Sequence, residues 1–346
     1  MLTKEDIIAE AERLGFADIG FTDASPFASQ QDYLLAHQKE YDWASQKGIK
    51  LLAGCDPKNI LPRAKSIIVL LSSYFEESFP RQMERHFGRC YLDDDRMTKD
   101  GLALKVKAFR KFLQSNNIES KVPFNLPHRL AAARAGLGTL GKNCFFYSGR
   151  KARGSSFVSP IALVVDAEFR PDEPTIGIGC PDWCRSACIA ACPTRALKGG
   201  GKIDPQKCIS YLTYYGEGLT PLSLREPMGL YVYGCDRCQN VCPRNEPWIT
   251  EAKPTNPRVG AKADAFDLSC LLHMDKAYFE EKIRPHMFYM SADQLWRWQM
   301  NAARAMGNSL DPAYLADLKR ALKENPDKRV QSMCIWALER IESGRP

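Results

Sequence analysis

The sequence has no long apolar run and no sign of export. No stretch of about 18 or more apolar residues occurs in its 346 residues, so no membrane-spanning helix is predicted. Residues 1–6 carry neither a signal peptide nor a twin-arginine pair. We therefore expect a cytoplasmic protein, in which thiols stay reduced and disulfide bonds are rare. The formal net charge of +7 permits an anionic partner such as RNA but does not require one.

Cysteine, by contrast, is abundant and clustered. Eight of the thirteen cysteines lie within residues 180–242, and three of them directly precede a proline, including the last cysteine of each closely spaced group. The eight are Cys180, Cys184, Cys188, Cys192, Cys208, Cys235, Cys238 and Cys242. Closely spaced cysteines that end in Cys-Pro and recur later in the chain are typical of proteins with two [4Fe–4S] clusters. The pattern therefore predicts a ferredoxin-like double-cluster domain.

The same pattern predicts which cysteines share a cluster. In two-cluster ferredoxins the cysteine before the proline ligates the other cluster, so we expect crossed ligand sets. One set would be Cys180, Cys184, Cys188 and Cys242, and the other Cys192, Cys208, Cys235 and Cys238. Two structural zinc sites are the alternative, since Cys₄ zinc sites also use short spacings. A disulfide framework is disfavoured, because Cys-Pro pairs have no part in one.

The first cysteine run departs from the usual bacterial spacing. Three residues, not two, separate its first three cysteines. At this spacing the thiols would form one stripe on a continuous helix. Pro181 and Pro193 should prevent such a helix.

The segments before the cysteines predict an α/β (α+β) domain. Residues 3–6 have the pattern of a capping box, and Gly15 should end the helix that follows. A strand over 66–74 is apolar on both faces, as in a sheet covered on both sides. Further strands are expected at 18–22 and 157–165, and helices at 102–113 and 127–135.

The segments after the cysteines predict a helical cap. A linker is expected up to about residue 264, followed by amphipathic helices within 291–307 and 312–342. These helices form either one HEAT-like unit or a simple cap on the core. We therefore divide the chain into an α/β domain (1–170), a double-cluster domain (171–250) and a C-terminal helical domain (251–346).

Several residues outside the cysteine run are candidates for function. Cys90 lies in a charged loop over 76–101 and could face a ligand; the acidic run 93–95 in the same loop is either a metal site or solvated. His128 precedes a glycine run and has either a structural or a functional role. Cys270 and Cys334 lie on apolar faces and are expected in the core.

Together, several segments resemble the epoxyqueuosine reductases. These are cytoplasmic enzymes with two [4Fe–4S] clusters and a cobalamin, related in their core to reductive dehalogenases. The matching segments are 15–21, 61–68, 129–144, 191–194, 207–213, 233–243 and 301–306. The resemblance implies a cobalamin between the α/β and cluster domains, and an electron donor of the ferredoxin or flavodoxin type. It implies corrinoid contacts at Cys90, Ser159, Ser210, Gly234, Asp236 and Arg237.

The sequence also departs from this family. Family reductases carry a Val-Asp-Thr-Gly segment whose Asp donates a proton, and here Val122 stands in its place. His128 or Asp94 is a candidate replacement. We therefore predict a cobalamin-dependent iron–sulfur reductase with a different substrate. The alternatives are an electron-transfer or activator protein without its own substrate, and a tRNA-binding protein. As a substrate, tRNA is not favoured.

Overall fold

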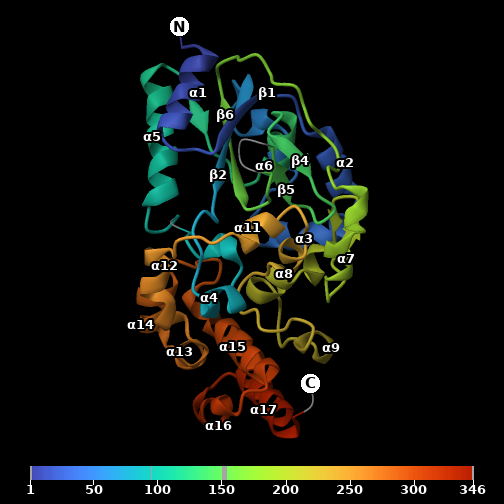
Figure 1. Ribbon diagram of the computed structural model, residues 1–346, viewed down its shortest axis with the longest axis vertical. Coiled ribbons are helices and arrows are strands. Elements are labelled where there is room, and N and C mark those ends of the chain that lie inside the picture. Colours follow the sequence, from blue (N-terminus) through green and yellow to red (C-terminus); the bar gives the residue numbers. More distant parts are fainter. Residues whose placement is uncertain (1, 95, 150–153, 345–346) are drawn as a thin grey trace.

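The computed structural model describes residues 2–94, 96–149 and 154–344. Its N-terminal part is built around a sheet and its C-terminal part is helical, with the two ends of the chain at opposite ends of the molecule (Figure 1). Within those ranges no helix is both long and apolar enough to cross a membrane.

The main sheet has four antiparallel strands in the order β1-β2-β6-β3. Their bounds are β1 Asp18–Asp23, β2 Ser66–Ser73, β6 Val158–Val165 and β3 Ser120–Lys121. The longest pairing, between β2 and β6, sets Ser66 opposite Val165 and Ser73 opposite Val158. The strands expected at 18–22, 66–74 and 157–165 are thus confirmed to within a residue or two.

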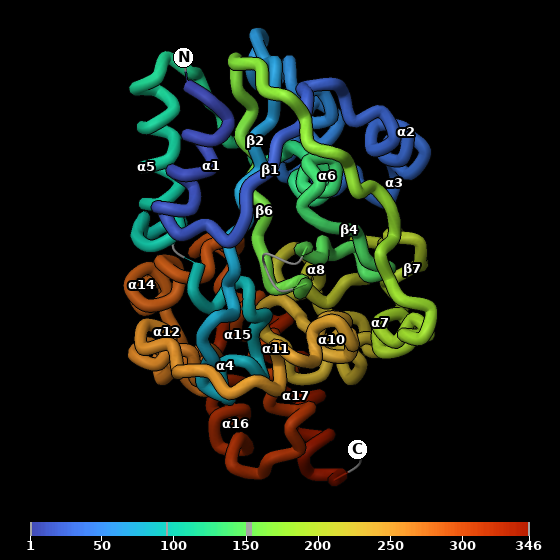
Figure 2. Tube along the Cα trace, turned by 45° about the horizontal axis from the view of Figure 1, so that its top comes forward, coloured from blue at the N-terminus to red at the C-terminus, as the bar shows by residue number. Residues whose placement is uncertain are grey.

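Helices cover both faces of this sheet, as the apolar pattern of β2 predicts. Ile68 and Leu70 pack in one core with Phe109, whereas Ile67 and Val69 pack in another with Ala132. The first face carries α1 (Lys4–Arg13) and α5 (Gly101–Ser115), and the second carries α6 (His128–Arg134) and α2 (Ala28–Ala36) (Figures 1 and 2). The short α3 (Gln38–Gln46) follows α2.

The predicted start of the chain is confirmed in detail. Thr3 is the N-cap of α1 and forms the capping box with Asp6, so the first turn of the helix has its free N–H groups partly satisfied. Gly15 follows the helix with a φ of 75°, which a residue with a side chain adopts at a cost.

The cysteine segment is made of short turns and helices. The first run is not one continuous helix, as expected, but the break lies at Arg185 and Ser186 and not at the two prolines. Both residues have left-handed backbones (φ 47° and 59°) between Cys184 and the helix that carries Cys188. Its elements are α7 Ala187–Ala190, β7 Leu197–Gly199, β8 Lys202–Ile203, α8 Ile209–Tyr214, α9 Leu222–Arg225 and α10 Arg237–Asn240. A second small hairpin precedes it, β4 (Gly138–Leu140) with β5 (Phe146–Ser148).

The C-terminal part is helical, as predicted, but the expected linker up to residue 264 is wrong. That stretch contains α11 (Glu246–Thr250) and α12 (Pro257–Lys262), and its Trp248 and Val259 are buried in the largest core. The remaining helices are α13 Leu268–His273, α14 Lys276–Tyr278, α15 Leu295–Ser309, α16 Leu315–Glu324 and α17 Lys328–Ser343. Their HEAT-like character stays a prediction.

The two cysteines expected in this core differ. Cys334 is buried, as predicted, whereas Cys270 is exposed, which corrects the expectation for that residue. Leu268, Leu271 and Leu272 form the buried side of α13, so Cys270 points to solvent. The same core also takes in Phe75 to Leu92 together with α4 (Arg81–His86), so it crosses the boundaries expected from the sequence.

Helix α15 is joined to the cysteine segment by hydrogen bonds from two of its side chains. Asn301 donates through Nδ2 to the carbonyls of Thr213 (2.8 Å) and Val232 (3.1 Å). Arg304 donates to the carbonyls of Gly229 (2.7 Å) and Tyr231. Both side chains are fully buried, so these bonds satisfy carbonyl groups that water does not reach.

Candidate functional site

The eight clustered thiols lie in two neighbouring groups. Burial raises the pKa of Cys188, and the thiols that add to this are Cys180, Cys242 and Cys184. Burial also raises the pKa of Cys238, with further contributions from Cys235, Cys208 and Cys188. Cys192 likewise raises the pKa of Cys208. These electrostatic influences run mostly within the sets that the sequence predicts, and Cys188 also influences Cys238 of the other set; the ligand sets stay a prediction.

Hydrogen-bond donors are directed at several of these sulfurs. The backbone N–H of Lys142 donates to Cys180 Sγ (3.3 Å), and the Tyr147 hydroxyl donates to Cys242 Sγ (3.1 Å). Cys208 accepts from the backbone N–H groups of Ser210 and Tyr211, which offset part of the rise in its pKa by burial. Such donors favour the charged thiolate that a metal cluster requires.

Cys90 lies beside the second thiol group. The backbone nitrogen of Cys235 is 3.2 Å from the position that a Cβ on Gly88 would take, so the Cys90 loop runs against the cysteine segment. Burial raises the pKa of the Cys90 thiol to about 12, and the Asp236 carboxylate adds to this, whereas Arg129 lowers it.

Tyrosine rings fill the space next to Cys90. Tyr91 packs edge-on against Tyr214, Tyr233 and Tyr289, and the hydroxyls of Tyr91 and Tyr214 are 3.3 Å apart. Burial raises the pKa of Tyr91 well above its ordinary value, so the hydroxyl stays protonated. Tyr214 and Tyr233 come from the two segments that flank Cys208 and Cys235, so aromatic rings lie beside the cluster cysteines.

The six residues expected to contact a corrinoid lie in several different surroundings. Gly234 (φ 79°) lies against the ring of Tyr91, next to the Cys90 loop. The backbone N–H of Ser210 is directed at Cys208. Ser159 lies on β6 opposite Ser72.

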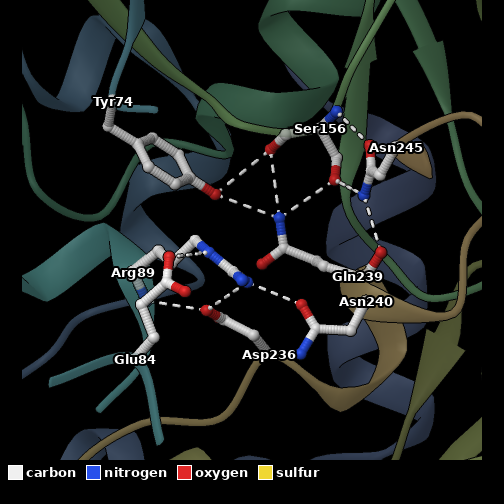
Figure 3. Close-up of polar contacts among 8 residues, drawn as sticks. All are labelled: Tyr74, Glu84, Arg89, Ser156, Asp236, Gln239, Asn240 and Asn245. Carbon is white, nitrogen blue, oxygen red and sulfur yellow. Dashed lines mark hydrogen bonds and ion pairs between the residues drawn. The ribbon is translucent and has the colours of Figure 1, made fainter. Parts of the chain in front are cut away.

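Asp236 and Arg237 have contacts with other protein groups, and a corrinoid contact for them stays a prediction. Asp236 is buried and pairs with Arg89, whose Nη1 is 3.3 Å and backbone N 2.8 Å from Asp236 Oδ2 (Figure 3). Arg237 is exposed and lies against Gly229, because its Nη2 is 2.7 Å from where a Cβ on that glycine would be. Asp236 therefore serves a buried ion pair, which Glu84 and Asn240 extend by hydrogen bonds to Arg89.

A second buried polar network holds α10 against the end of β6. Gln239 donates through Nε2 to Tyr74 Oη (3.0 Å) and Ser156 Oγ (2.9 Å) (Figure 3). Asn245 donates to Ser156 Oγ (2.8 Å) and to the carbonyl of Gln239 (3.0 Å). The networks together join residues about 80 to 165 positions apart in the chain. They fix the cysteine turn to the sheet domain.

The candidate proton donors have other partners. His128 Nε2 is 2.6 Å from the carbonyl of Pro123, and its Nδ1 accepts from the N–H of Ala162 (2.9 Å). Both ring nitrogens are thus used and burial lowers the His128 pKa, which favours the structural role. Asp94 pairs with Arg96. Asp93 accepts from Arg258 (2.6 Å), and Asp95 lies outside the described residues.

Two residues near the thiols were not predicted from the sequence. The charge of Arg129 lowers the pKa of both Cys90 and Cys144, and its guanidinium stacks over Phe145 (4.6 Å to the ring centroid). Tyr147 donates to Cys242 from a strand 95 residues earlier. No local pattern marks either residue, because their neighbours at the site come from distant parts of the chain.

The comparisons with known proteins agree with this geometry. Residues 181–245 match a family model described as a 4Fe-4S double cluster binding domain, which makes this an iron–sulfur protein of the double-cluster class. The chain is 29% identical over 356 residues to the epoxyqueuosine reductase of Bacillus subtilis (98% of this chain, 87% of the relative). The chain is thus similar to the epoxyqueuosine reductases over nearly its whole length.

Two solved structures are similar over nearly the whole chain. The epoxyqueuosine reductase from Streptococcus thermophilus has a TM-score of 0.77 at 26% identity and covers 100% of this chain and 92% of its own. An epoxyqueuosine reductase with a tRNA-Tyr epoxyqueuosine-modified stem loop has a TM-score of 0.71 at 26% identity, covering 98% of both chains.

Proposed function

We propose that this protein is a reductase with two [4Fe–4S] clusters and a cobalamin, acting on a substrate other than epoxyqueuosine. One observation carries the proposal: two adjacent thiol groups lie beside a loop that presents another cysteine, Cys90. This arrangement provides a path for electrons from an iron–sulfur pair to a third site.

The thiol groups suit [4Fe–4S] clusters in their donor chemistry. One cluster would be held by Cys180, Cys184, Cys188 and Cys242, and the other by Cys192, Cys208, Cys235 and Cys238. Four thiolates per cluster is the usual ligand number. The N–H of Lys142 and the hydroxyl of Tyr147 would stabilise negative charge on the first cluster through its sulfurs.

The surroundings of Cys90 fit a cobalamin only in part, because tyrosine rings fill the space next to the thiol. Cys90 itself is partly exposed, and Gly234 and the ring of Tyr91 lie close to its loop. When bound, cobalamin supplies a cobalt that low-potential electrons convert into a strong nucleophile. The packed rings of Tyr91 and Tyr214 would limit the access of water there, and burial keeps their hydroxyls protonated.

A substrate other than epoxyqueuosine is proposed because the family's proton-donor Asp is missing here. Val122 is 39% exposed and has no proton to donate, and the Asp94 carboxylate is paired with Arg96. A carboxylate occupied by a guanidinium in this way is not free to act on a substrate as a general acid. The reaction would therefore need no carboxylic acid, or it would take its proton from a tyrosine such as Tyr91.

A tRNA is the substrate carrier to test first, because a similar structure was solved with a tRNA stem loop. The net charge of +7 would favour such binding. The second candidate function is electron transfer to a partner protein without a substrate of its own. The absence of the family's Asp at Val122 favours this alternative, since electron transfer needs no proton donor.

The decisive experiment is an anaerobic titration of the cluster-loaded protein with cob(II)alamin, followed by EPR. Stoichiometric binding with a changed cobalt signal is expected, and Cys90→Ser should alter that signal while leaving the iron content unchanged. A protein with both clusters that binds no cob(II)alamin would refute the reductase and leave the electron-transfer function.

A further inference from the structure

Trp183 marks an unusual part of the surface. Its side chain is 68% exposed although it lies between Cys180 and Cys184, and Ile176 and Ile178, just before this turn, are 59% and 40% exposed. A bridge to Leu140 fixes the backbone at Ile178. Single exposed apolar residues are ordinary on a protein surface. Here three of them lie within the eight residues 176–183, next to Cys180 and Cys184, and form a patch of the kind that binds a partner.

The thiols beside this patch form the outer of the two groups. Helix α7, which carries Cys188, lies at the edge of the molecule in both views (Figures 1 and 2). The inner group lies against the Cys90 loop through Cys235. Helix α7, which carries Cys188, contacts α10, which carries Cys238, so the two groups are neighbours. An electron that arrives at Trp183 would thus meet the outer cluster first, then the inner cluster, and then the Cys90 site.

Basic side chains lie beside the patch. Residues 176–200 contain three of them, of which Lys198 is paired with Glu40, and a single acidic residue, Asp182. Arg185 is exposed, and within the described ranges no ion pair joins it to an acid. The ammonium of Lys142 lies at the same turn, because its Nζ is 3.2 Å from Ser186 Oγ.

We propose that this surface, here called the donor face and formed by Lys142, Ile176, Ile178, Trp183 and Arg185, docks an acidic one-electron carrier of the ferredoxin type. The proposal rests on the function proposed above and names the partner of its outer cluster. The basic side chains attract and orient the carrier, and the indole of Trp183 supplies the central apolar contact. One electron leaves the reduced carrier, which is oxidised, and converts one [4Fe–4S]²⁺ cluster to [4Fe–4S]⁺; no bond breaks and no proton moves.

The test is anaerobic stopped-flow reduction of the cluster-loaded protein by a photoreduced acidic [2Fe–2S] ferredoxin. Trp183→Ala and Arg185→Glu should each lower the second-order rate by about tenfold or more, and Arg185→Glu should flatten its dependence on salt. Dithionite, which needs no docking, should reduce all variants equally. The controls are Leu222→Ala, which is also 68% exposed but lies on α9, and Lys107→Glu on α5, across the molecule.

Each outcome separates the two proposals. Rates for Trp183→Ala and Arg185→Glu within about twofold of the controls would overturn the donor face. If Trp183→Ala loses iron, Arg185→Glu carries the test alone, because its side chain points to solvent. A wild-type protein without absorbance near ~400 nm would instead refute the clusters themselves, before any ferredoxin is added.

Discussion

Removing the guanidinium of Arg89 should destabilise the protein strongly. The side chains of Arg89 and Asp236 are only 8% and 4% exposed, so Arg89→Met would leave a buried carboxylate without its cation. The guanidinium also stacks over Phe75 at 4.8 Å, a contact that methionine replaces only in part. The pair ties the loop of Cys90 to the turn between Cys235 and Cys238, so its loss acts on both halves of the site.

The size of the effect follows from the burial. Breaking a buried ion pair on one side costs about 3–5 kcal/mol. With an unfolding entropy of roughly 2.1 cal/mol/K per residue over this chain, that loss lowers the melting temperature by about 4–7 °C. The backbone N–H of Arg89 still donates to Asp236 in the variant (2.8 Å), which favours the lower end.

The assay is anaerobic thermal unfolding followed by circular dichroism, with iron content measured in parallel. The double variant Arg89→Met/Asp236→Leu should recover most of the loss, since it removes both charges together. Arg13→Met is the matched control, because Arg13 pairs with Glu10 through two hydrogen bonds but is 67% exposed; its cost should stay below about 0.5 kcal/mol. If Arg89→Met melts within about 1 °C of the wild type, the pair contributes little and this reasoning is wrong.

Three further predictions test other parts of the molecule. Cys184→Ser and Cys235→Ser should each lose one cluster, measured as iron per chain, whereas Cys270→Ser, an exposed thiol, should keep both; full iron in all three contradicts the ligand sets. Burial lowers the pKa of His286 to about 4 from 6.5, so between these values only the unfolded chain is protonated and stability falls as the pH drops; His286→Phe should remove about 1 kcal/mol of the loss between pH ~7 and ~5 in urea unfolding, and an unchanged slope would refute this. Gly234 has a φ of 79° and no room for a Cβ, which would lie 2.5 Å from a tyrosine ring, so Gly234→Ala should cost at least about 1–3 kcal/mol of stability; a wild-type melting curve would show that the ring moves freely.

Local signals in the sequence predicted local structure well. The capping box at Thr3, the doubly buried strand Ser66–Ser73 and the break in the first cysteine run each depend on residues a few positions apart. The helices between residues 246 and 262 were missed because their prolines suggested a linker. Pro247 and Pro257 lie in the first turn of α11 and α12, where a missing N–H costs nothing.

The site was predictable in its chemistry but not in its orientation. The spacing of the cysteines indicates which thiols gather, because a cluster imposes that pattern on the sequence. No pattern indicates that Asp236 turns inward, since its partner Arg89 lies 147 residues away. The exposure of Cys270 was missed for a related reason, because a helix of six residues is too short for its apolar side to be read from periodicity.

The bonds from α15 to the cysteine segment also bear on how the protein is made. Asn301 and Arg304 satisfy buried carbonyls between Thr213 and Tyr231, yet they are synthesised about 60 residues after Cys242. At roughly 5–20 residues per second, all eight thiols leave the ribosome about 3–12 s before the helix that fastens them. During that interval the segment is open to cluster assembly, and also to oxidation. Docking of α15 closes the interval, because its Asn301 and Arg304 then bind the carbonyls of Thr213 and Tyr231.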